Sequence, residues 1–283
     1  MIKLGLIGYP LSHSMSAVIH NEAFKSCGIE GTYEILETDP ESLIDQIKFL
    51  KSRNFTGFNV TIPLKVPITL FLDQVDNITN QAGCANTVKI LPDKSLAGYN
   101  TDVYGFIKAI PMDVQSALQG KKVAILGNGG AARAAAVALA QLKVGQVDFY
   151  VRNIINASNM VSIVRENFPN IEINTFQIQH LENLSKYSML VNTTPIGMRG
   201  KAMGLSPIPE SAIKTLDKNA TVYDIVYNPI KTALLEMAQD NGLRTINGLD
   251  MLIYQAEKAF EIWTGHTPDT KLMKIAALES LTK

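Results

Sequence analysis

Short runs of apolar residues alternate along the chain with longer stretches in which apolar residues recur every three or four positions. The first pattern is typical of buried strands, and the second of helices that cover one face of a sheet. In the first hundred residues we predict strands at 3–7, 32–37, 55–62, 87–91 and 96–99 and helices that begin at Ser14, Pro40 and Pro67. The spacing after Pro40 directs Leu43, Ile44, Ile47 and Leu50 toward the core. Strands that alternate with helices favour an α/β fold.

The chain leaves this first unit near Thr101, and a second α/β unit begins at Lys122. The residues between them, 103–120, are expected to form a linking helix and a loop. In the second unit we predict strands at 123–126, 147–151, 189–192 and 220–225, a helix at 131–142, and amphipathic helices at 250–264 and 272–281. Since 283 residues are long for one hydrophobic core and comfortable for two, we expect two domains.

Composition and charge exclude several classes of protein. With 46% hydrophobic and 18% charged residues, the chain has the composition of a packed globular protein. Lys plus Arg and Asp plus Glu each number 26, and this balance argues against nucleic acid or an anionic membrane as partner. No apolar run approaches the roughly 20 residues of a membrane span, and the start of the chain has the pattern of a strand rather than a signal peptide. Cys27 and Cys84 lack metal-ligand spacing and indicate a reducing compartment, so we expect a cytoplasmic protein without a bound metal.

The run Gly127-Asn128-Gly129-Gly130-Ala131 lies between a predicted strand and a predicted helix, in the order that a dinucleotide site requires. Gly127 permits the tight turn, and Gly129 lets the backbone approach a pyrophosphate without a Cβ in the way. The helix N-terminus then offers N–H groups and a positive dipole end to the phosphates. The simpler alternative is a glycine-rich turn with a purely structural role.

The end of the next predicted strand bears on which dinucleotide is bound. An NAD site has an acidic residue roughly 20 residues further on, where it binds the ribose. This chain has Val151-Arg152-Asn153 at that point, and an arginine can pair with a 2′-phosphate in fork geometry. We therefore predict NADP. The alternative is a solvated arginine, and because Asn156 adds no second cation nearby, use of NAD stays open.

Polar groups are concentrated in three segments of the first unit. The first segment has Ser14 and Ser16 where a strand ends and a helix begins. One serine would suffice to cap the helix, whereas two alternating hydroxyls suit a ligand rich in hydroxyl or carboxylate groups. His13 and His20, in the same segment, are expected to be structural hydrogen-bonding residues rather than catalysts.

The second and third segments contain the components of an acid/base pair. Thr61 and Lys65 straddle the end of the strand predicted at 55–62, and Asn86 and Asp102 flank the hairpin, at opposite ends of its two strands. A carboxylate beside a lysine holds the ammonium in place and sets its protonation, so that the lysine can give or take a proton. The alternative is a lysine that is only a solvated surface charge.

Six short motifs follow one another along nearly the whole chain. They are Ser14-x-Ser16 with His20-Asn21, Asn59-Val60-Thr61-x-Pro63-x-Lys65, Ala85-Asn86-Thr87, Asn100-Thr101-Asp102, Gly127-x-Gly129-Gly130-Ala131, and Gly248-Leu249-x-Met251-Leu252-x-x-Gln255. Six motifs in this order closely resemble those of shikimate dehydrogenase. The resemblance implies a reversible, NADP-dependent reduction of 3-dehydroshikimate to shikimate in aromatic amino-acid biosynthesis.

The resemblance also implies an architecture and a set of partners. It implies an N-terminal α/β substrate domain, residues 1–102 completed by residues 250–283. A Rossmann-type, doubly wound NADP-binding domain would span residues 103–249, with an active-site cleft between the two domains. The expected partner is a small-molecule substrate, with no nucleic acid and no membrane, and a homodimer is left open.

Carried over residue by residue, the resemblance implies that Lys65 is the catalytic acid/base residue beside Asp102. The substrate-binding residues it implies are Ser14, Ser16, Thr61, Lys65, Asn86, Asp102, Tyr227 and Gln255. The cofactor-binding residues it implies are Gly127, Asn128, Gly129, Gly130, Ala131, Arg152, Ile225 and Gly248. In this set the two serines bind the substrate carboxylate, with Tyr227 near it, and Arg152 binds the adenosine phosphate.

Three positions depart from the family pattern. Ala17 stands where proline is usual, Asn128 where alanine is usual, and Val151 where asparagine is usual, and the last change weakens the phosphate clamp. The alternatives are a quinate/shikimate dehydrogenase that uses NAD, a methylene-tetrahydrofolate dehydrogenase, and an inactive nucleotide-sensing regulator. Ser16 favours shikimate, because quinate-preferring relatives tend to carry threonine there, and intact Lys65 and Asp102 argue against the regulator.

Overall fold

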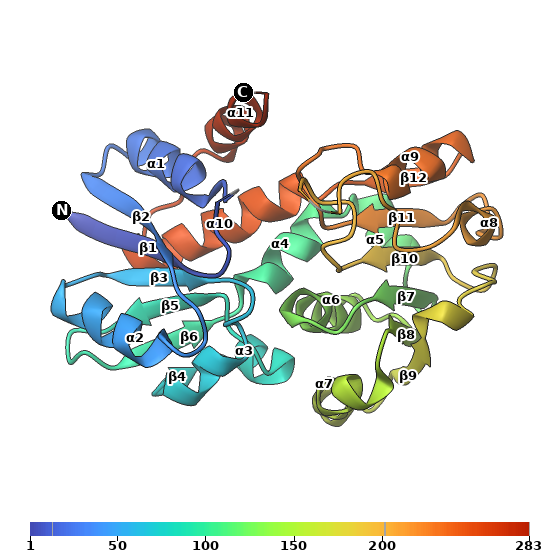
Figure 1. Cartoon of the computed structure of the whole chain (residues 1–283), viewed down its shortest axis with the longest axis horizontal. Coiled ribbons are helices and arrows are strands. Elements are labelled where there is room, and N and C mark those ends of the chain that lie inside the picture. The colour runs from blue at the N-terminus through green and yellow to red at the C-terminus, as the bar shows by residue number, and fades with distance from the viewer. Residues whose placement is uncertain (13, 201, 283) are drawn as a thin grey trace. The chain divides into compact units, whose positions relative to one another are not determined.

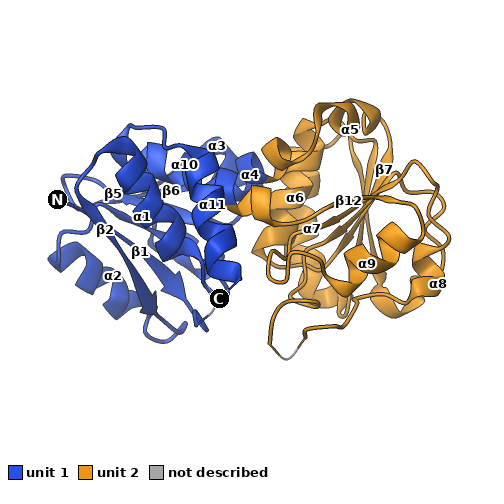
Figure 2. Cartoon of the chain, turned by 90° about the horizontal axis from the view of Figure 1, so that it is seen from above, with its two compact units in different colours: residues 1–105, 253–283 blue, residues 106–252 orange. Residues whose placement is uncertain are grey.

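The computed structural model describes residues 1–12, 14–200 and 202–282, so the expectation for His13 lies outside the described residues. The chain divides into two compact units, residues 1–105 with 253–283 and residues 106–252 (Figure 2). It passes from the first unit to the second within α4 (Thr101–Ala109) and returns within α10 (Leu249–Thr264).

The first unit is built on a six-stranded sheet with the order β2-β1-β3-β5-β6-β4 (Figure 1). Its strands are β1 (Ile2–Gly8), β2 (Gly31–Glu37), β3 (Gly57–Val60), β4 (Gln74–Val75), β5 (Thr87–Ile90) and β6 (Leu96–Tyr99). β1 is parallel to both β2 and β3, whereas β3, β5 and β6 are antiparallel neighbours, as the predicted hairpin requires. Its other helices are α1 (Ser16–Cys27), α2 (Leu43–Ser52), the 3₁₀ helix η1 (Pro67–Phe71), α3 (Asn77–Ala82) and α11 (Thr270–Leu281).

The C-terminal helices complete this first unit. α11 packs beside α1 (Figure 1). Two side chains fasten α10 to the sheet. Trp263 Nε1 donates to the carbonyl of Val88 at 2.9 Å, and Lys89 Nζ donates to the carbonyl of Ile262 at 2.6 Å. The indole lies directly over Gly57, where a Cβ would come within 2.2 Å of Nε1 and 2.5 Å of the Val88 carbonyl oxygen. Only glycine at this position lets α10 approach the sheet so closely.

The second unit is a six-stranded parallel sheet with the order β12-β11-β10-β7-β8-β9. Its strands are β7 (Lys122–Leu126), β8 (Gln146–Val151), β9 (Glu172–Gln177), β10 (Met189–Asn192), β11 (Thr221–Asp224) and β12 (Arg244–Ile246). Its helices are α5 (Met112–Ala117), α6 (Gly130–Gln141), α7 (Ile154–Asn167), η2 (Ile178–His180), α8 (Glu210–Ile213) and α9 (Ala233–Asp240). If these six strands are numbered 1 to 6 along the chain, their order in the sheet is 6-5-4-1-2-3. This is the strand order of a doubly wound dinucleotide-binding sheet, so the predicted Rossmann-type fold is confirmed.

Several predicted details need correction. The helix expected from Pro40 begins at Leu43, and Ile44 is 48% exposed rather than buried. In a helix that buries Leu43, Ile47 and Leu50, the position after Leu43 lies about 100° away from this apolar stripe. The span predicted as one linking helix and a loop contains two helices, the rest of α4 and all of α5.

A buried carboxylate lies within the second sheet. Asp148, on β8, accepts hydrogen bonds from the Tyr187 hydroxyl at 2.6 Å, from Gln146 Nε2 at 2.8 Å and from Asn174 Nδ2 at 3.0 Å. Lys186 Nζ lies 3.2 Å from the same carboxylate. Burial raises the pKa of Asp148, but these donors together hold it below its ordinary value. The group therefore stays ionised and joins β8, β9 and the loop before β10.

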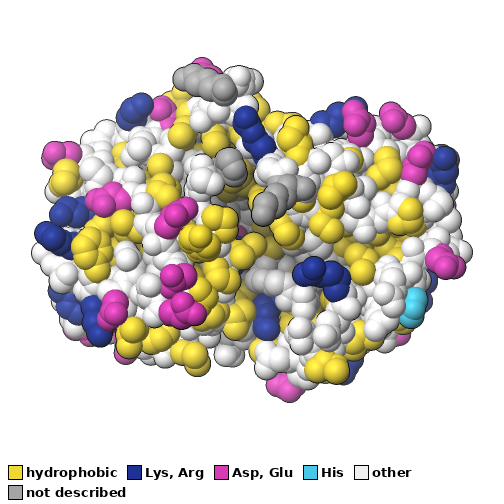
Figure 3. Space-filling view, viewed as in Figure 1, with side chains coloured by type: hydrophobic (Ala, Val, Ile, Leu, Met, Phe, Trp, Pro, Cys, Tyr) yellow, Lys and Arg dark blue, Asp and Glu magenta, His cyan; other side chains and the backbone are white. Residues whose placement is uncertain are grey.

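The charged surface agrees with the neutral composition. Acidic and basic side chains are interspersed over the face that Figure 3 shows. Within the described residues, no helix combines the length and apolar character needed to cross a membrane.

The contact between Gly57 and Trp263 leads to a stability prediction. Gly57→Ala should lower the free energy of unfolding by about 2 kcal/mol, because the added methyl group overlaps the indole and the Val88 carbonyl. Urea unfolding followed by circular dichroism measures the loss. Trp263→Phe, which removes the N–H donor but keeps an aromatic ring, is the comparison variant. A Gly57→Ala protein as stable as wild type would show that α10 does not pack in this way.

Candidate active site

A buried ion pair joins the lysine and the aspartate that were predicted to form an acid/base pair. Lys65 Nζ lies 2.5 Å from Asp102 Oδ2, and the two side chains are only 15% and 7% exposed. Asp102 lies in the first turn of α4, and Lys65 lies in the turn between β3 and η1. That turn is held in place because the Ala85 N–H donates to the Lys65 carbonyl at 2.9 Å. Lys65 is therefore a partner in an ion pair, and the alternative of a solvated surface lysine is wrong.

Asn86 organises the acidic side of this pair. Its Nδ2 lies 2.9 Å from Asp102 Oδ1, 2.9 Å from Thr101 Oγ1 and 3.3 Å from Gln255 Oε1. Its Oδ1 accepts the backbone N–H of Thr101 at 2.7 Å, which ties Asn86 to the start of α4. The structure thus brings Lys65, Asn86, Asp102 and Gln255 together. These residues come from separate stretches of the chain, and the C-terminal α10 supplies the last of them.

The predicted serine pair lies at the start of α1. The N-cap residue is Met15, and no described side chain caps it, so neither serine acts as the usual cap. Instead, Ser14 Oγ donates to Ser16 Oγ at 3.2 Å and accepts the Ser16 N–H at 3.3 Å. Burial raises the pKa of Tyr33, whose hydroxyl donates to Asn59 Oδ1 at 2.7 Å, well above its ordinary value.

Two further residues of the first unit were named from the sequence. Thr61 follows β3, and its N–H donates to the Ile7 carbonyl at 2.9 Å. His20 is fully buried and stacks on Tyr33, with ring centroids 4.4 Å apart and an interplanar angle of 7°. Burial lowers the pKa of His20 to about 3, so the ring is neutral at physiological pH, and neither ring nitrogen has a hydrogen-bond partner among the described residues. His20 is therefore structural through ring stacking, and the prediction that it forms hydrogen bonds is wrong.

In the second unit, the glycine turn has the geometry that phosphates need. Gly127 has φ +111°, and a Cβ there would lie 2.8 Å from Thr193 Oγ1. Around a Cβ built on Gly129, by contrast, no described atom lies within 4 Å. Gly129 is also the N-cap of α6, so none of the described side chains fills that cap. The turn is thus closely packed on one side and open on the other, which fits a pyrophosphate at the helix N-terminus.

Arg152 and its neighbour lie at the end of β8. Arg152 is exposed, which fits both the predicted contact with a 2′-phosphate and the alternative of a solvated arginine. Asn153 caps α7, because its Oδ1 accepts the N–H groups of Ile155 at 2.9 Å and Asn156 at 3.2 Å. The preference of asparagine for N-cap positions could have revealed this helix from the sequence.

The other two predicted cofactor residues are in direct contact. A Cβ on Gly248 would lie 1.9 Å from the Ile225 carbonyl oxygen, and the Gly248 N–H donates to the Val226 carbonyl at 3.2 Å. A side chain at position 248 would therefore separate these loops. Tyr227 follows two residues after Ile225 and is half-buried.

Asp224, just before Ile225, is a buried carboxylate that sequence reasoning missed. It accepts hydrogen bonds from Thr232 Oγ1 at 2.7 Å, Asn192 Nδ2 at 2.9 Å and the Val226 N–H at 3.0 Å. Burial raises its pKa to about 6, and these three donors oppose the rise. Asp224 therefore holds together the segments that follow β10 and β11. A charged residue inside a predicted apolar strand was the available signal.

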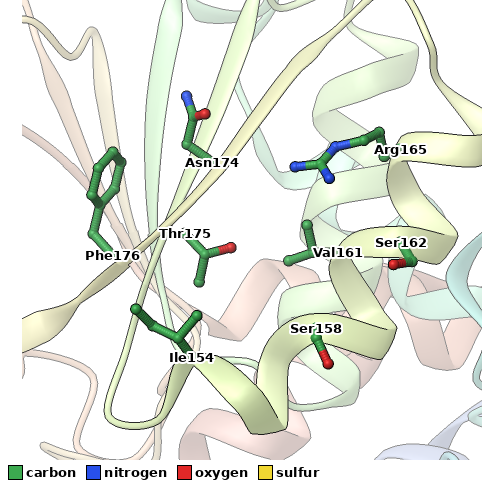
Figure 4. A pocket seen from close by; sticks show the side chains of 8 residues that line it. All are labelled: Ile154, Ser158, Val161, Ser162, Arg165, Asn174, Thr175 and Phe176. Atoms are coloured by element: carbon green, nitrogen blue, oxygen red, sulfur yellow. The ribbon is translucent and has the colours of Figure 1, made fainter.

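A surface pocket of about 360 Å³ lies elsewhere in the second unit, between α7 and β9 (Figure 4). It is lined by Ile154, Ser158, Val161, Ser162, Arg165, Asn174, Thr175 and Phe176. None of the predicted site residues lines this pocket. Arg165, its cation, donates to the Ile173 carbonyl at 2.7 Å and so helps to join the helix to the strand.

Known proteins resemble the chain along its whole length. The model of the shikimate dehydrogenase substrate binding domain matches residues 6–88, and that of the shikimate 5′-dehydrogenase C-terminal domain matches residues 248–278. The shikimate dehydrogenase (NADP(+)) of Halothermothrix orenii is 37% identical over 269 residues, which are 94% of this chain and 92% of that protein.

Solved structures agree with these matches. Shikimate 5-dehydrogenase from Thermus thermophilus in complex with shikimate has a TM-score of 0.83 at 32% identity, with 100% of both chains covered. Quinate dehydrogenase from Corynebacterium glutamicum in complex with NAD has a TM-score of 0.88 at 28% identity, covering 98% of this chain and 99% of that one.

The sheet in dinucleotide-binding order and the separate unit with its lysine–aspartate pair are the arrangement expected of a two-domain dehydrogenase. The matches in sequence are more specific than the fold. The chain belongs to the shikimate dehydrogenase family.

The raised pKa of Asp224 predicts how stability depends on pH. Between the ordinary value of 3.8 and about 6, the folded chain retains a proton on Asp224 that the unfolded chain has lost. The stability contributed by this proton is fully present below about pH 4 and is lost as the pH rises through 6. Relative to Asp224→Asn, wild type should therefore lose about 2 kcal/mol between pH 4 and pH 7, at 1.36 kcal/mol per pKa unit.

Urea unfolding of the wild-type protein and of Asp224→Asn at pH 4, 5.5 and 7 measures this difference. A constant difference between the two proteins across the three pH values would contradict the raised pKa.

Proposed function

We propose that this chain is a shikimate dehydrogenase, which reversibly reduces 3-dehydroshikimate to shikimate with NADP in aromatic amino-acid biosynthesis. The observation that carries the proposal is the buried pair of Lys65 and Asp102, 2.5 Å apart, in a member of this family. The relatives support it, because the Halothermothrix orenii protein is a shikimate dehydrogenase (NADP(+)) and the Thermus thermophilus structure contains shikimate.

In this proposal the first unit is the substrate domain. Ser14 and Ser16 bind the substrate carboxylate, since both hydroxyls lie at the start of α1 without serving as its cap. Tyr227 of the second unit binds near the same carboxylate. The ring hydroxyls are held by Thr61, Asn86, Asp102 and Gln255. This assignment is supported by Asn86, whose Nδ2 contacts both Asp102 Oδ1 and Gln255 Oε1.

The acid/base chemistry follows from the charges of the pair. A bound nicotinamide dinucleotide would supply the hydride in the direction of reduction. Lys65 gives a proton to the substrate carbonyl oxygen as negative charge develops there, and takes it back in the reverse direction. Asp102 keeps the ammonium in position, and Asn86 keeps the Asp102 carboxylate turned toward it.

The second unit holds the cofactor in this proposal. Gly127, Asn128, Gly129, Gly130 and Ala131 bind the pyrophosphate, supported by the open space over Gly129. Arg152 binds the 2′-phosphate of NADP, and Ile225 and Gly248 line the nicotinamide pocket. The substrate domain comprises residues 1–102 with 250–283, and the NADP-binding domain comprises residues 103–249.

The proposal extends to compartment and assembly. We propose a cytoplasmic enzyme, supported by Cys27 and Cys84, which are thiols rather than a disulfide in the structure. We propose that it forms a homodimer, which sedimentation equilibrium would test. The alternative of a quinate/shikimate dehydrogenase with NAD is favoured by the fold shared with the quinate enzyme and opposed by Arg152.

Removal of the lysine amine tests the acid/base role. Lys65→Ala should lower kcat for shikimate oxidation by about 10²–10⁴-fold and change the KM for shikimate far less, because the ammonium acts in the transition state. Steady-state rates followed at the absorbance of the reduced nicotinamide measure both constants. Lys48→Ala, at a lysine that is 70% exposed, is the control. A raised KM with an unchanged kcat would remove Lys65 from the chemistry.

Removal of the guanidinium tests the choice of cofactor. Arg152→Ala should raise the KM for NADP by about 10–100-fold, since a hydrogen bond to a charged group contributes roughly 1.5–3 kcal/mol. The KM for NAD, which lacks the 2′-phosphate, should stay within about two-fold. Arg165→Ala, the next arginine along the chain, is the matched control. Equal losses with both cofactors would mean that Arg152 does not read the 2′-phosphate.

A further inference from the structure

A tyrosine outside the candidate active site joins α4 to α10 within the first unit. The Tyr104 hydroxyl on α4 donates to Glu257 Oε2 on α10 at 3.3 Å. The ammonium of Lys258, the next residue of α10, lies over the Tyr104 ring at 5.8 Å from the ring centroid. Two consecutive residues of α10 therefore contact the hydroxyl and the ring of the same tyrosine.

The acceptor in this contact is a buried acidic residue. Glu257 is only 7% exposed. A carboxylate that is taken out of water costs free energy unless it accepts hydrogen bonds from the protein, and the Tyr104 hydroxyl supplies one. A hydrogen bond to a charged group is roughly twice as strong as one between neutral groups. The contact is thus directional, and it fixes one atom of α10 against one atom of α4.

The tyrosine contact lies close to the candidate active site along both helices. Tyr104 follows Asp102 by two residues on α4, and Glu257 follows Gln255 by two residues on α10. Two residues correspond to about 3 Å along a helix axis and to about 200° around it. Each helix is therefore held on one side by the tyrosine contact and on another side by Asn86, whose Nδ2 contacts both of the earlier residues.

α10 is also fastened to the sheet, but further along its length. Trp263, which donates to the Val88 carbonyl, is about 12 Å along the helix from Gln255. Between these two points the buried face of α10 includes the small side chains of Ala256 and Ala259. Apolar burial is non-directional, so it favours this face without fixing the helix along its axis. The tyrosine contact supplies a directional hold close to Gln255.

We propose that Tyr104 is a positioning residue, which through Glu257 holds Gln255 where it binds the ring hydroxyls of the substrate. This inference rests on the proposed function, in which Gln255 is one of the residues that bind those hydroxyls. When the contact is lost, α10 keeps its buried face inward but can shift along its axis near Gln255. A shift of this kind weakens the hydrogen bonds to the substrate.

The acid/base pair is held independently of the tyrosine contact. The backbone N–H of Thr101 donates to Asn86 Oδ1 at 2.7 Å. Asn86 Nδ2 in turn holds the Asp102 carboxylate, which pairs with Lys65. None of these four residues belongs to α10. Loss of the Tyr104 hydroxyl should therefore change substrate binding far more than it changes the turnover number.

Tyr104→Phe tests the inference, because it keeps the ring that Lys258 contacts and removes only the hydroxyl. We expect a rise of about five-fold in the KM for shikimate, with kcat within about two-fold of wild type, since binding alone is weakened. Steady-state rates followed at the absorbance of the reduced nicotinamide measure both constants. In a Gln255→Ala background the same substitution should change KM by less than about two-fold, because the hydroxyl acts through Gln255.

Variants of the acceptor and a matched control separate positioning from folding. Glu257→Gln keeps an oxygen that can accept the Tyr104 hydrogen and should leave KM within about two-fold of wild type, whereas Glu257→Ala should repeat the effect of Tyr104→Phe. Tyr187→Phe is the control, since it removes a buried hydroxyl that donates to the Asp148 carboxylate at 2.6 Å in the other unit. It should lower Tm and leave kcat and KM for shikimate unchanged.

A wild-type KM in both Tyr104→Phe and Glu257→Ala would overturn the positioning role and leave the proposed function intact. A rise in KM that is equally large in the Gln255→Ala background would also overturn it, because the hydroxyl would then act through the fold as a whole. A wild-type protein that does not turn over shikimate would overturn the proposed function, and the positioning role with it.

Discussion

The salt bridge between Lys65 and Asp102 is the interaction on which the first unit depends. A buried ion pair is costly unless its remaining lone pairs and hydrogens find partners, and loss of one member leaves an uncompensated charge. Here Asn86 supplies the partner for Asp102, and the backbone of Thr101 fixes Asn86 in turn. The hairpin, the start of α4 and the turn before η1 must all hold their positions for the pair to exist.

The second unit has a different constraint. The backbone of its glycine turn must stay accessible to a ligand and still be held in place by the rest of the unit. Gly127 packs closely against Thr193, whereas Gly129 faces open space. The turn is therefore held by the protein at Gly127 and accessible at Gly129. Asp224 likewise holds a loop in place, next to Ile225, which contacts Gly248. Its three hydrogen bonds join the segments after β10 and β11. In both units, buried polar groups thus hold loops in position.

Several strands and the glycine turn could be predicted from the sequence, because they depend on residues that are close together in the chain. Strand β10 was predicted with its exact bounds from an apolar run, and the glycine turn from its place between strand and helix. β9 was missed, since its residues Glu172–Gln177 form an edge strand with little apolar alternation. The contact between Asn86 and Gln255 follows from no local pattern, because the two residues are 169 positions apart and contacts of Trp263 and Ile262 hold α10 to the sheet. The family resemblance alone placed both residues at the substrate.

The most direct measurement is an absorbance assay at the reduced-nicotinamide band that crosses shikimate and quinate with NADP and NAD. We predict the highest kcat/KM for shikimate with NADP. This preference is expected because the serine pair and the Lys65–Asp102 pair serve the substrate and Arg152 serves the 2′-phosphate. A higher kcat/KM for quinate with NAD, or no reduction of either cofactor with shikimate, would contradict it.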